Sequence, residues 1–313
     1  MRILILGAGG VGGYFGGRLV QAGQEVTFLV RPGRALQLHR DGLIVESPLG
    51  NLRVPVRCVT AEEVRPEFDA VILTCKAYDL DSAIAAVEPA VGVGTLILPL
   101  LNGLAHIDRL DKQFGAHRVV GGLCQLAVTL TETGTIRHLN RIASIAYGSR
   151  DPRTRDGCAA IDEAFRASGL DAEWSQDIVR DLWEKFVFLT TLAGMTCLMR
   201  GAVGDIVQTS HGKDAMLELL DTCRRTAAAA GVALRPERML RVEELVTDPG
   251  STLTASMLRD VERGGRTEAD HILGDMLRRT EEAGLDAALL RLADCHLQTY
   301  ERRRLREAAV AGR

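Results

Sequence analysis

The sequence predicts an α/β fold in which a doubly wound parallel sheet is followed by an all-α domain. The apolar run from Ile3 to Leu6 leads directly into a glycine-rich loop, as expected of a buried parallel strand that turns into a helix. Further short apolar runs, separated by helical stretches, follow in the first half of the chain. Beyond about residue 176 the apolar residues recur at helical spacing and no strand pattern is convincing. We therefore predict two domains, at residues 1–176 and 177–313.

Composition narrows the class of protein. With 313 residues, of which 46% are hydrophobic, the chain is long enough to bury the cores of two domains. The 38 basic and 41 acidic side chains give a formal net charge of −3, so we expect neither nucleic acid nor a membrane as a partner. The sequence has no secretory signal pattern and no charge-free apolar span of about 20 residues, which favours a cytoplasmic protein.

The seven cysteines are scattered along the chain without a C-x-x-C pair. We interpret them as buried free thiols of a protein in a reducing compartment. No metal site is predicted.

The glycine loop after the first predicted strand has the G-x-G-x-x-G spacing of a dinucleotide-binding turn. Gly7 permits the tight turn, Gly9 lets the backbone approach a pyrophosphate, and Gly12 lets the following helix lie close to the strand. The helix N-terminus then offers unpaired N–H groups and the positive end of its dipole to the phosphates. The alternative is a plain structural turn. The residues that we assign to the cofactor here are Gly7, Ala8, Gly9, Gly10, Val11 and Gly12.

The end of the second predicted strand, Glu25 to Val30, indicates which cofactor binds. Folds that prefer NAD place a carboxylate there for the ribose 2′-hydroxyl, whereas this chain has Arg31 and, three residues later, Arg34. A guanidinium suits a 2′-phosphate, so Arg31 predicts NADPH/NADP+ as the cofactor. The alternative is that both arginines are solvated loop charges.

Two polar residues follow two further predicted strands. Lys76 comes directly after the run from Asp69 to Cys75, and Asn102 comes directly after the run from Gly94 to Leu101. Because ligands gather at the carboxyl ends of parallel strands, both residues are candidates for contact with the nicotinamide and the substrate. The alternatives are a solvated lysine after a strand and an Asn-Gly turn without chemistry.

The remainder of the first domain predicts two strands and a helix. Alternation in residues 126–131 and 135–138 indicates strands, which we interpret as an antiparallel addition to the sheet with His138 at the surface. Residues 152–169 predict a helix that ends at Gly169. In the second domain, helices are expected at residues 213–230, 237–246 and 267–283.

Several motifs occur in a fixed order along the chain. They are the N-terminal glycine loop, Arg31, Leu-Thr-Cys-Lys76, Leu-Leu-Asn102-Gly103, Leu-Trp-Glu-Lys185, Ser256-Met-Leu-Arg-Asp260 and Gly-Arg-Thr-Glu268. This order resembles the ketopantoate reductase family, the 2-dehydropantoate 2-reductases, along nearly the whole chain. The resemblance implies a Rossmann domain followed by a helical domain similar to that of 6-phosphogluconate dehydrogenases. It also implies NADPH-dependent reduction of a 2-oxo acid to a 2-hydroxy acid, in pantothenate biosynthesis.

The resemblance assigns roles to individual residues. Lys185 matches the catalytic lysine, which donates a proton to the carbonyl oxygen as the alkoxide forms. Glu268 matches a carboxylate that hydrogen-bonds the substrate, Ser256 a hydroxyl at the substrate's carboxylate end, and Asn102 an asparagine near both nicotinamide and substrate. Taken alone, Lys185 would be a helix lysine with its amine in solvent, Glu268 an ordinary helix glutamate, and Ser256 an N-cap.

The sequence departs from the family pattern at the substrate. One and two helical turns after the catalytic lysine, the pantoate-specific enzymes carry asparagines that hold the substrate, and here those positions are Leu189 and Ala193. Neither side chain can donate to a substrate oxygen, so the substrate is either ketopantoate or a more apolar analogue. Thr190, Thr191 and Thr196 are the candidates to replace the missing contacts from a shifted register.

Other functions stay open at this level. An opine-type or 3-hydroxyacid dehydrogenase shares the architecture, and a non-catalytic NADP(H)-sensing protein would keep the glycine loop without the chemistry. The combination of Lys185, Asn102 and Glu268 argues against the sensor. We expect a small-molecule oxo-acid or ketone substrate, bound in a cleft between the carboxyl edge of the sheet and the helical domain, and leave a homodimer open.

Overall fold

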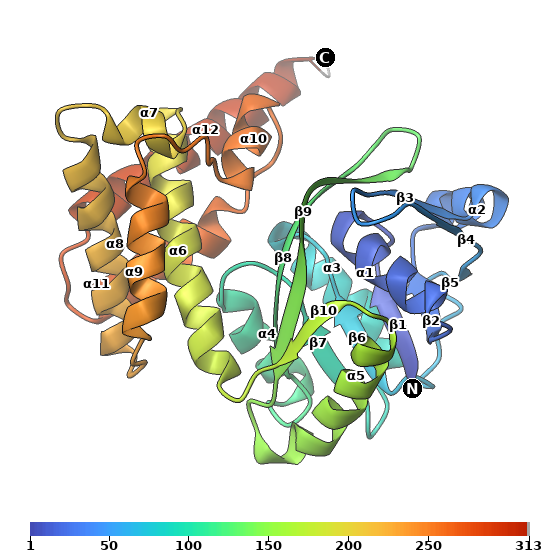
Figure 1. Ribbon diagram of the computed structural model, residues 1–313. Coiled ribbons are helices and arrows are strands. Elements are labelled where there is room, and N and C mark those ends of the chain that lie inside the picture. The colour runs from blue at the N-terminus through green and yellow to red at the C-terminus, as the bar shows by residue number, and fades with distance from the viewer. Residues whose placement is uncertain (312–313) are drawn as a thin grey trace. The chain divides into compact units, whose positions relative to one another are not determined.

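The chain divides into two compact units. A computed structural model describes residues 1–311. The first unit comprises Met1–Leu101 and His106–Val179, and the second comprises Asn102–Ala105 together with the chain from Arg180 onward (Figure 1). The short segment that begins at Asn102 therefore groups with the second unit, although the strand just before it belongs to the first.

The five strands of the first sheet all run parallel, in the order β5-β2-β1-β6-β7. Their bounds are β1 Arg2–Leu6, β2 Glu25–Leu29, β5 Arg57–Val59, β6 Ala70–Leu73 and β7 Leu96–Pro99. β1 lies at the centre, where Ile5 is opposite Phe28 of β2 and Ile72 of β6. β6 and β7 are buried along their whole length, as expected of a parallel sheet that is covered on both faces. The sheet confirms the predicted α/β class.

Side chains of β1 point alternately into two cores, one on each face of the sheet. Ile3 and Ile5 pack in the core with residues of helices α1 and α5, and Leu4 packs in the core with residues of α3 and α4. The helices of this unit, with short 3-10 turns marked η, are α1 Gly10–Gln21, α2 Pro32–Asp41, η1 Ala77–Asp79, α3 Leu80–Val87, η2 Glu88–Ala90, α4 Ala105–Phe114, η3 Pro152–Thr154 and α5 Arg155–Ala167.

A second sheet has the order β10-β9-β3-β4, and β8 pairs with β9 in addition. Its strands are β3 Leu43–Glu46, β4 Leu52–Val54, β8 Gly121–Leu130, β9 Ile136–Gly148 and β10 Asp171–Trp174. The predicted antiparallel pair is therefore present as β8 and β9, but the prediction that it extends the first sheet is wrong. Ile97 of β7 forms an isolated bridge with Val119, just before β8, but β8 itself pairs with β9. β9 in turn pairs with β3 and β10.

The prediction that His138 lies at the surface is also wrong, because its side chain is buried. Its Nδ1 is 2.9 Å from the hydroxyl of Ser47 and its Nε2 is 3.0 Å from the carbonyl oxygen of Ile142. The ring also meets the ring of Tyr14 edge-on, with centroids 4.9 Å apart. The alternating pattern of the strand indicates which face of the sheet His138 lies on. It does not indicate that this face is covered, because the covering residue Tyr14 belongs to α1, which is distant in sequence.

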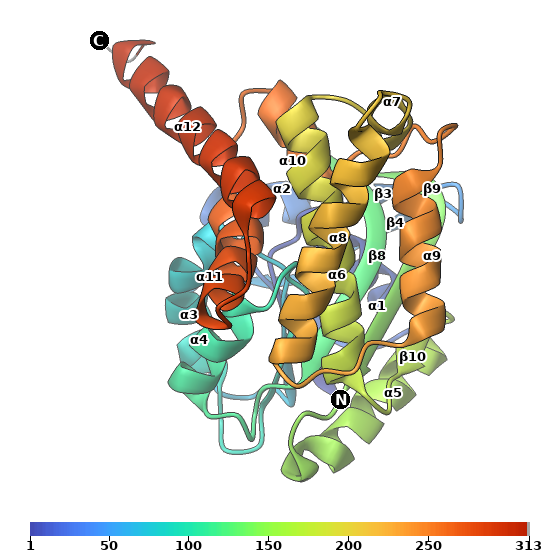
Figure 2. The same ribbon diagram turned by 90° about the vertical axis from the view of Figure 1, so that its left-hand side faces the viewer.

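The second unit is helical, and the structure has no strand between residues 178 and 311. Its elements are α6 Ile178–Met199, α7 Val203–Val207, α8 Gly212–Ala229, α9 Pro236–Thr247, α10 Ser256–Glu262, the π-helical turn η4 Asp270–Gly274, α11 Asp275–Glu282 and α12 Ala288–Ala311. Figure 2 shows α6, α8 and α9 running side by side. The helix predicted at residues 267–283 therefore starts later than predicted, with the wider π turn η4, and continues as α11 to Glu282.

Helix α6 forms the core of this unit. A Cβ built on Gly194 would lie 2.8 Å from Leu219 of α8, with Ala293 of α12 and Leu273 of η4 within 4 Å, so neighbouring elements approach α6 closely here. By length and composition α6 would also suit a membrane span, but 72% of its most apolar window is buried inside the protein. Such burial is typical of the core helix of a soluble domain.

Candidate functional site

The glycine loop between β1 and α1 has the geometry that its sequence predicts. Gly7 has a φ of +90°, which L-residues with side chains rarely adopt, and its N–H donates to the carbonyl oxygen of Leu29 at 2.9 Å. A Cβ on Gly12 would lie 2.3 Å from the carbonyl oxygen of Gly7 and 2.4 Å from Oγ1 of Thr74. Only glycine fits at Gly12, because any side chain would push α1 away from β1.

The N-terminus of α1 is open to an anion. Gly9 is the N-cap and supplies no capping side chain, so the first N–H groups of the helix are not satisfied in that way. A Cβ built on Gly9 would meet no heavy atom of a more distant described residue within 4 Å. The loop therefore offers backbone donors, a helix dipole and space, which is what a pyrophosphate requires.

Two side chains that we had not assigned to the site hold this loop. Thr74 Oγ1 donates to the carbonyl oxygen of Leu6 at 2.8 Å, and Arg34 Nη2 donates to the carbonyl oxygen of Ala8 at 2.9 Å. The one signal for Thr74 was its place at the end of β6, next to the central strand. The sequence showed Arg34 only as a second arginine after β2.

Arg31 and Lys76 lie at the same edge of the sheet as the glycine loop. β2 and β6 flank β1 in parallel, so the residues that follow all three strands meet at their carboxyl ends. Arg31 is exposed at the N-cap of α2, and Lys76 is exposed at the N-cap of η1.

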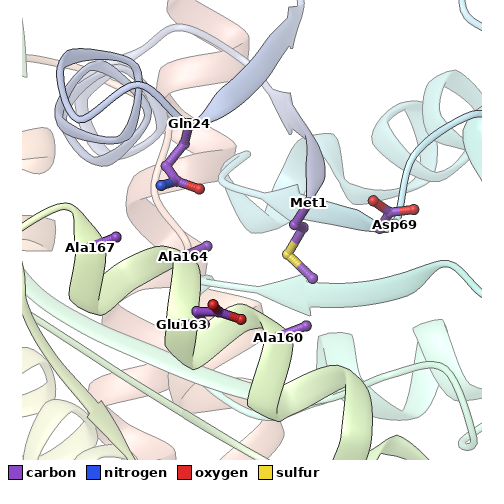
Figure 3. Close-up of a pocket in the computed structure, with 7 residues that line it drawn as sticks. All are labelled: Met1, Gln24, Asp69, Ala160, Glu163, Ala164 and Ala167. Atoms are coloured by element: carbon purple, nitrogen blue, oxygen red, sulfur yellow. The ribbon is translucent and has the colours of Figure 1, made fainter.

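A hollow of about 410 Å³ lies elsewhere on this unit (Figure 3). Met1, Gln24 and Asp69 line one side of it, and each of them directly precedes a strand of the first sheet. The other side is formed by α5, which contributes Ala160, Glu163, Ala164 and Ala167. The hollow therefore opens at the amino ends of the strands, opposite the edge where ligands gather in sheets of this type.

On the second unit, Lys185 is half-buried in α6. Leu189 and Ala193 follow it at spacings of four residues, so the three side chains lie along one face of the helix. Leu189 is half-buried and Ala193 is 3% exposed. The face that carries the amine is consequently apolar over the next two turns.

Glu268 is 8% exposed and lies two residues before the π turn η4. Its neighbour Thr267 donates to Glu301 of α12 twice, through its N–H at 2.7 Å and its hydroxyl at 2.8 Å. The backbone that carries Glu268 is therefore fixed from one side by α12. π turns are frequent at functional sites, since they redirect side chains within a helix.

Asn102 lies beside the same segment. His271, at the start of η4, hydrogen-bonds the backbone of Asn102. Gly103 has a φ of +81°, and a Cβ there would lie 2.9 Å from the carbonyl oxygen of His271 and 3.0 Å from its ring carbon Cδ2. The structure thus brings Asn102 and the segment of Glu268 together, and sequence reasoning missed His271, which joins them.

Burial lowers the pKa of His271 from its ordinary value of 6.5. The nearby carboxylates of Glu268, Asp275 and Asp270 favour the protonated ring, as does the bond to Asn102, but desolvation outweighs them. His271 is therefore held in its neutral form near neutral pH.

The structure also describes Ser256 and the three threonines of α6 that follow Lys185. Ser256 is exposed and is the first residue of α10, whose N-cap is Ala255, so Ser256 does not cap the helix. Thr191 and Thr196 use their hydroxyls on carbonyl oxygens of their own helix, at 2.9 and 2.7 Å. The Thr190 hydroxyl is buried and has no partner among the described residues.

Over residues 1–311 no three His, Cys, Asp or Glu side chains cluster as metal ligands would.

Comparison with known proteins gives two family matches that together span most of the chain. The family described as ketopantoate reductase PanE/ApbA matches residues 3–152, and its C-terminal counterpart matches residues 177–299. The uncharacterized oxidoreductase YkpB of Bacillus subtilis (strain 168) is 35% identical over 303 residues, which cover 96% of this chain and 99% of that protein. The 2-dehydropantoate 2-reductase of Archaeoglobus fulgidus is 30% identical over 291 residues, covering 93% of this chain and 94% of that protein.

Among solved structures, a ternary complex of D-mandelate dehydrogenase with NADH and anilino(oxo)acetate superposes with a TM-score of 0.86. It covers 97% of this chain and 99% of its own, at 22% sequence identity. At that identity the likeness shows the fold alone.

Proposed function

This chain belongs to the ketopantoate reductase PanE/ApbA family and is an oxidoreductase, and on that premise we propose that it reduces a 2-oxo acid to the 2-hydroxy acid with NADPH. The proposed substrate is ketopantoate or an analogue with a more apolar substituent. The observation that carries this choice of substrate is the apolar face of α6, on which Leu189 and Ala193 follow Lys185.

The residues of the first unit fit a nicotinamide dinucleotide. The close approach at Gly12 and the uncapped N-terminus of α1 form a cradle that side chains would fill. Arg31, exposed after β2, would bind a 2′-phosphate, and no carboxylate stands there for a free 2′-hydroxyl. The D-mandelate dehydrogenase complex contains NADH, so the fold by itself does not imply NADPH, and the proposed preference for NADPH rests on Arg31.

Bound NADPH would supply a hydride to the carbonyl carbon of the substrate. The oxygen then gains negative charge, and Lys185 donates the proton that neutralises it. Before transfer, the ammonium already stabilises the developing charge, because a cation within hydrogen-bond reach acts strongly where water is excluded. The half-buried position of Lys185 in an apolar helix suits this role.

The remaining candidates would bind and orient the substrate and cofactor. Glu268 accepts a hydrogen bond from the substrate, and Ser256 contacts its carboxylate end. Asn102 and Lys76 lie near both the nicotinamide and the substrate. In this arrangement the backbones of Asn102 and of the Glu268 segment are fixed through His271 and Glu301 before substrate arrives.

Leu189 and Ala193 favour an apolar substituent on the oxo acid. A site that offers methyl groups gains little from the hydroxyl of ketopantoate, since that hydroxyl would lose its bonds to water without replacement. Thr190 is the one of the three neighbouring threonines whose hydroxyl is not already bonded within α6. We therefore propose that apolar 2-oxo acids are better substrates than ketopantoate.

A panel of carbonyl substrates tests the proposal. NADPH oxidation is followed with ketopantoate, pyruvate, 2-oxo acids bearing branched aliphatic or phenyl groups, and 3-oxo acids, and each product is identified. The proposal predicts highest kcat/KM for an apolar 2-oxo acid. NADPH binding without turnover on any carbonyl would instead indicate a sensor, and preference for a 3-oxo acid would indicate a 3-hydroxyacid dehydrogenase. A cytoplasmic location belongs to the same proposal and is tested by fractionation. The homodimer stays open, and light scattering measures the oligomeric state.

A further inference from the structure

Arg34 lies in the first turn of α2 with its guanidinium against the glycine loop. Its Nη2 donates to the carbonyl oxygen of Ala8 at 2.9 Å, and its Nη1 donates to the carbonyl oxygen of Gly134 at 3.1 Å and to Gln37 Oε1 at 2.6 Å. The side chain is half-buried. One arginine therefore connects the loop after β1 with the turn between β8 and β9.

The bond to Ala8 fixes the direction of a peptide group in the glycine loop. In a planar trans peptide the C=O and the following N–H point in opposite directions. Because Arg34 holds the Ala8 carbonyl oxygen and the peptide is trans, the N–H of Gly9 faces away from Arg34. A Cβ built on Gly9 would meet no heavy atom of a more distant described residue within 4 Å, so the backbone at Gly9 is accessible to a ligand. A reversed peptide would present a carbonyl oxygen to an anion there, which repels it.

The turn between β8 and β9 is fastened to the same place. Gln37 Nε2 donates to the carbonyl oxygen of Thr133 at 2.7 Å. Gly134 has a φ of +82°, which residues with side chains rarely adopt, and a Cβ there would lie 2.2 Å from Gln37 Nε2 and 2.4 Å from Arg34 Nη1, so a side chain at this position would displace both groups. The two side chains of α2 thus enclose the tip of the hairpin.

The hairpin also packs directly on the first turns of α1. A Cβ on Gly10 would lie 2.8 Å from Cγ2 of Val128, and one on Gly13 would lie 2.2 Å from Cδ1 of Ile136. The start of α1 is therefore backed by β8 and β9.

We infer that Arg34 is a positioning residue of the dinucleotide site: it orients the Ala8–Gly9 peptide toward the pyrophosphate and fastens the β8–β9 turn to it. The inference rests on the proposed function, in which the chain binds a nicotinamide dinucleotide. The pyrophosphate is common to NADPH and NADH, so Arg34 serves both cofactors equally. Arg31, in contrast, serves only the cofactor with a 2′-phosphate.

A competing role for Arg34 would be direct binding of the 2′-phosphate, because its Nε is buried without a partner among the described residues. If this atom bound the 2′-phosphate, Arg34 would discriminate between the two cofactors as Arg31 does. Affinity for NADPH and for NADH must therefore be measured separately.

The test is a set of dissociation constants for both cofactors, measured by calorimetry on the full chain. The variants are Arg34→Ala, Arg34→Lys, Arg31→Ala and, as a matched control, Gln37→Ala. The control removes the hydrogen bonds of Gln37 to Thr133 and to Arg34 Nη1, and leaves the acceptor of Arg34 Nη2, the Ala8 carbonyl oxygen, in place. Thermal unfolding and circular dichroism establish that each variant is folded. For Arg34→Ala we expect the Kd of both cofactors to rise by the same factor, about tenfold or more for a lost charged hydrogen bond.

Arg34→Lys and Gln37→Ala show whether the change in Kd comes from the bond between Arg34 and the Ala8 carbonyl oxygen. Arg34→Lys, which can reach one carbonyl oxygen but not two in the fork geometry of arginine, should recover part of the affinity for both cofactors. Gln37→Ala should change either Kd by less than about threefold, equivalent to a fraction of one hydrogen bond.

Three results would overturn the inference while leaving the proposed function intact. They are an unchanged Kd for both cofactors in Arg34→Ala, a rise for NADPH alone, and a rise in Gln37→Ala as large as in Arg34→Ala. If Arg34→Ala does not fold, the Kd values of Arg34→Lys for NADPH and NADH are compared in the same way, and the same three results would overturn the inference. Absence of dinucleotide binding by the unmodified protein would instead refute the proposed function, and the inference with it.

Discussion

Arg235 binds Glu184, the residue immediately before Lys185 on α6. The backbone N–H of Arg235 donates to Glu184 Oε1 at 2.8 Å and its Nε donates to the same oxygen at 2.9 Å, while Nη2 also bonds Asp181. The Glu184 side chain is only 7% exposed, so its carboxylate depends on this partner. Because Arg235 is the N-cap of α9, the pair fixes the first half of α6, and with it the backbone of Lys185, against a second helix.

Removal of Arg235 should destabilise the protein. Arg235→Ala leaves a buried carboxylate without a counter-charge, and we expect the free energy of unfolding to fall by about 3 kcal/mol. Urea denaturation measures this change. Arg238→Ala, at an exposed position of the same helix, is the control and should alter stability by less than about 0.5 kcal/mol. Equal stabilities of the two variants would show that the pair contributes nothing.

Cofactor choice should depend on Arg31. Arg31→Ala should lower kcat/KM for NADPH by the equivalent of about 1.5–3 kcal/mol, the range for a hydrogen bond to a charged group, and leave kcat/KM for NADH nearly unchanged. Arg40→Ala, at an exposed arginine in the last turn of α2, is the control and should preserve the ratio. Equal kcat/KM of the unmodified protein for NADPH and NADH would show that Arg31 does not select NADPH through its 2′-phosphate.

Substrate choice should depend on Leu189. Leu189→Asn introduces an amide one turn after Lys185, and we expect the ratio of kcat/KM for ketopantoate to that for an apolar 2-oxo acid to rise by about tenfold, or 1.4 kcal/mol. Leu189→Met keeps the apolar character and should leave the ratio within about threefold. If the unmodified protein already reduces ketopantoate efficiently, other residues replace the missing asparagines.

His271 should make stability depend on pH below neutrality. Burial places the pKa of the folded state below 6.5, so as pH falls through 6.5 the unfolded chain binds a proton that the folded protein does not. Unfolding is therefore favoured increasingly, by at most about 1.4 kcal/mol per pH unit, until the pH reaches the lower pKa of the folded state. His271→Gln should flatten this dependence in urea titrations between pH 5 and 7. An identical slope in wild type and variant would contradict the assignment.

The sequence was informative where the signal is local. The glycine loop, the apolar strands and the change to helical periodicity all depend on neighbours within a few residues, and the structure has a parallel sheet followed by helices. His138 and His271 were missed because their surroundings come from distant elements, α1 in one case and the Asn102 turn in the other. Arg34 was noticed as a charge, but its partner is a backbone carbonyl group 26 residues away, which no spacing rule reveals.

The central claim is that Lys185 donates the proton, and Lys185→Ala tests it most directly. Two quantities are measured on the same preparation: the Kd for NADPH, and the rate of carbonyl reduction at saturating NADPH with the best substrate of the panel. Lys185→Arg is included because arginine keeps the positive charge but does not release its proton near neutral pH. We expect a nearly unchanged Kd for NADPH and a rate lower by roughly two to four orders of magnitude in both variants. A rate within about twofold of wild type in Lys185→Ala, with NADPH bound, would contradict it.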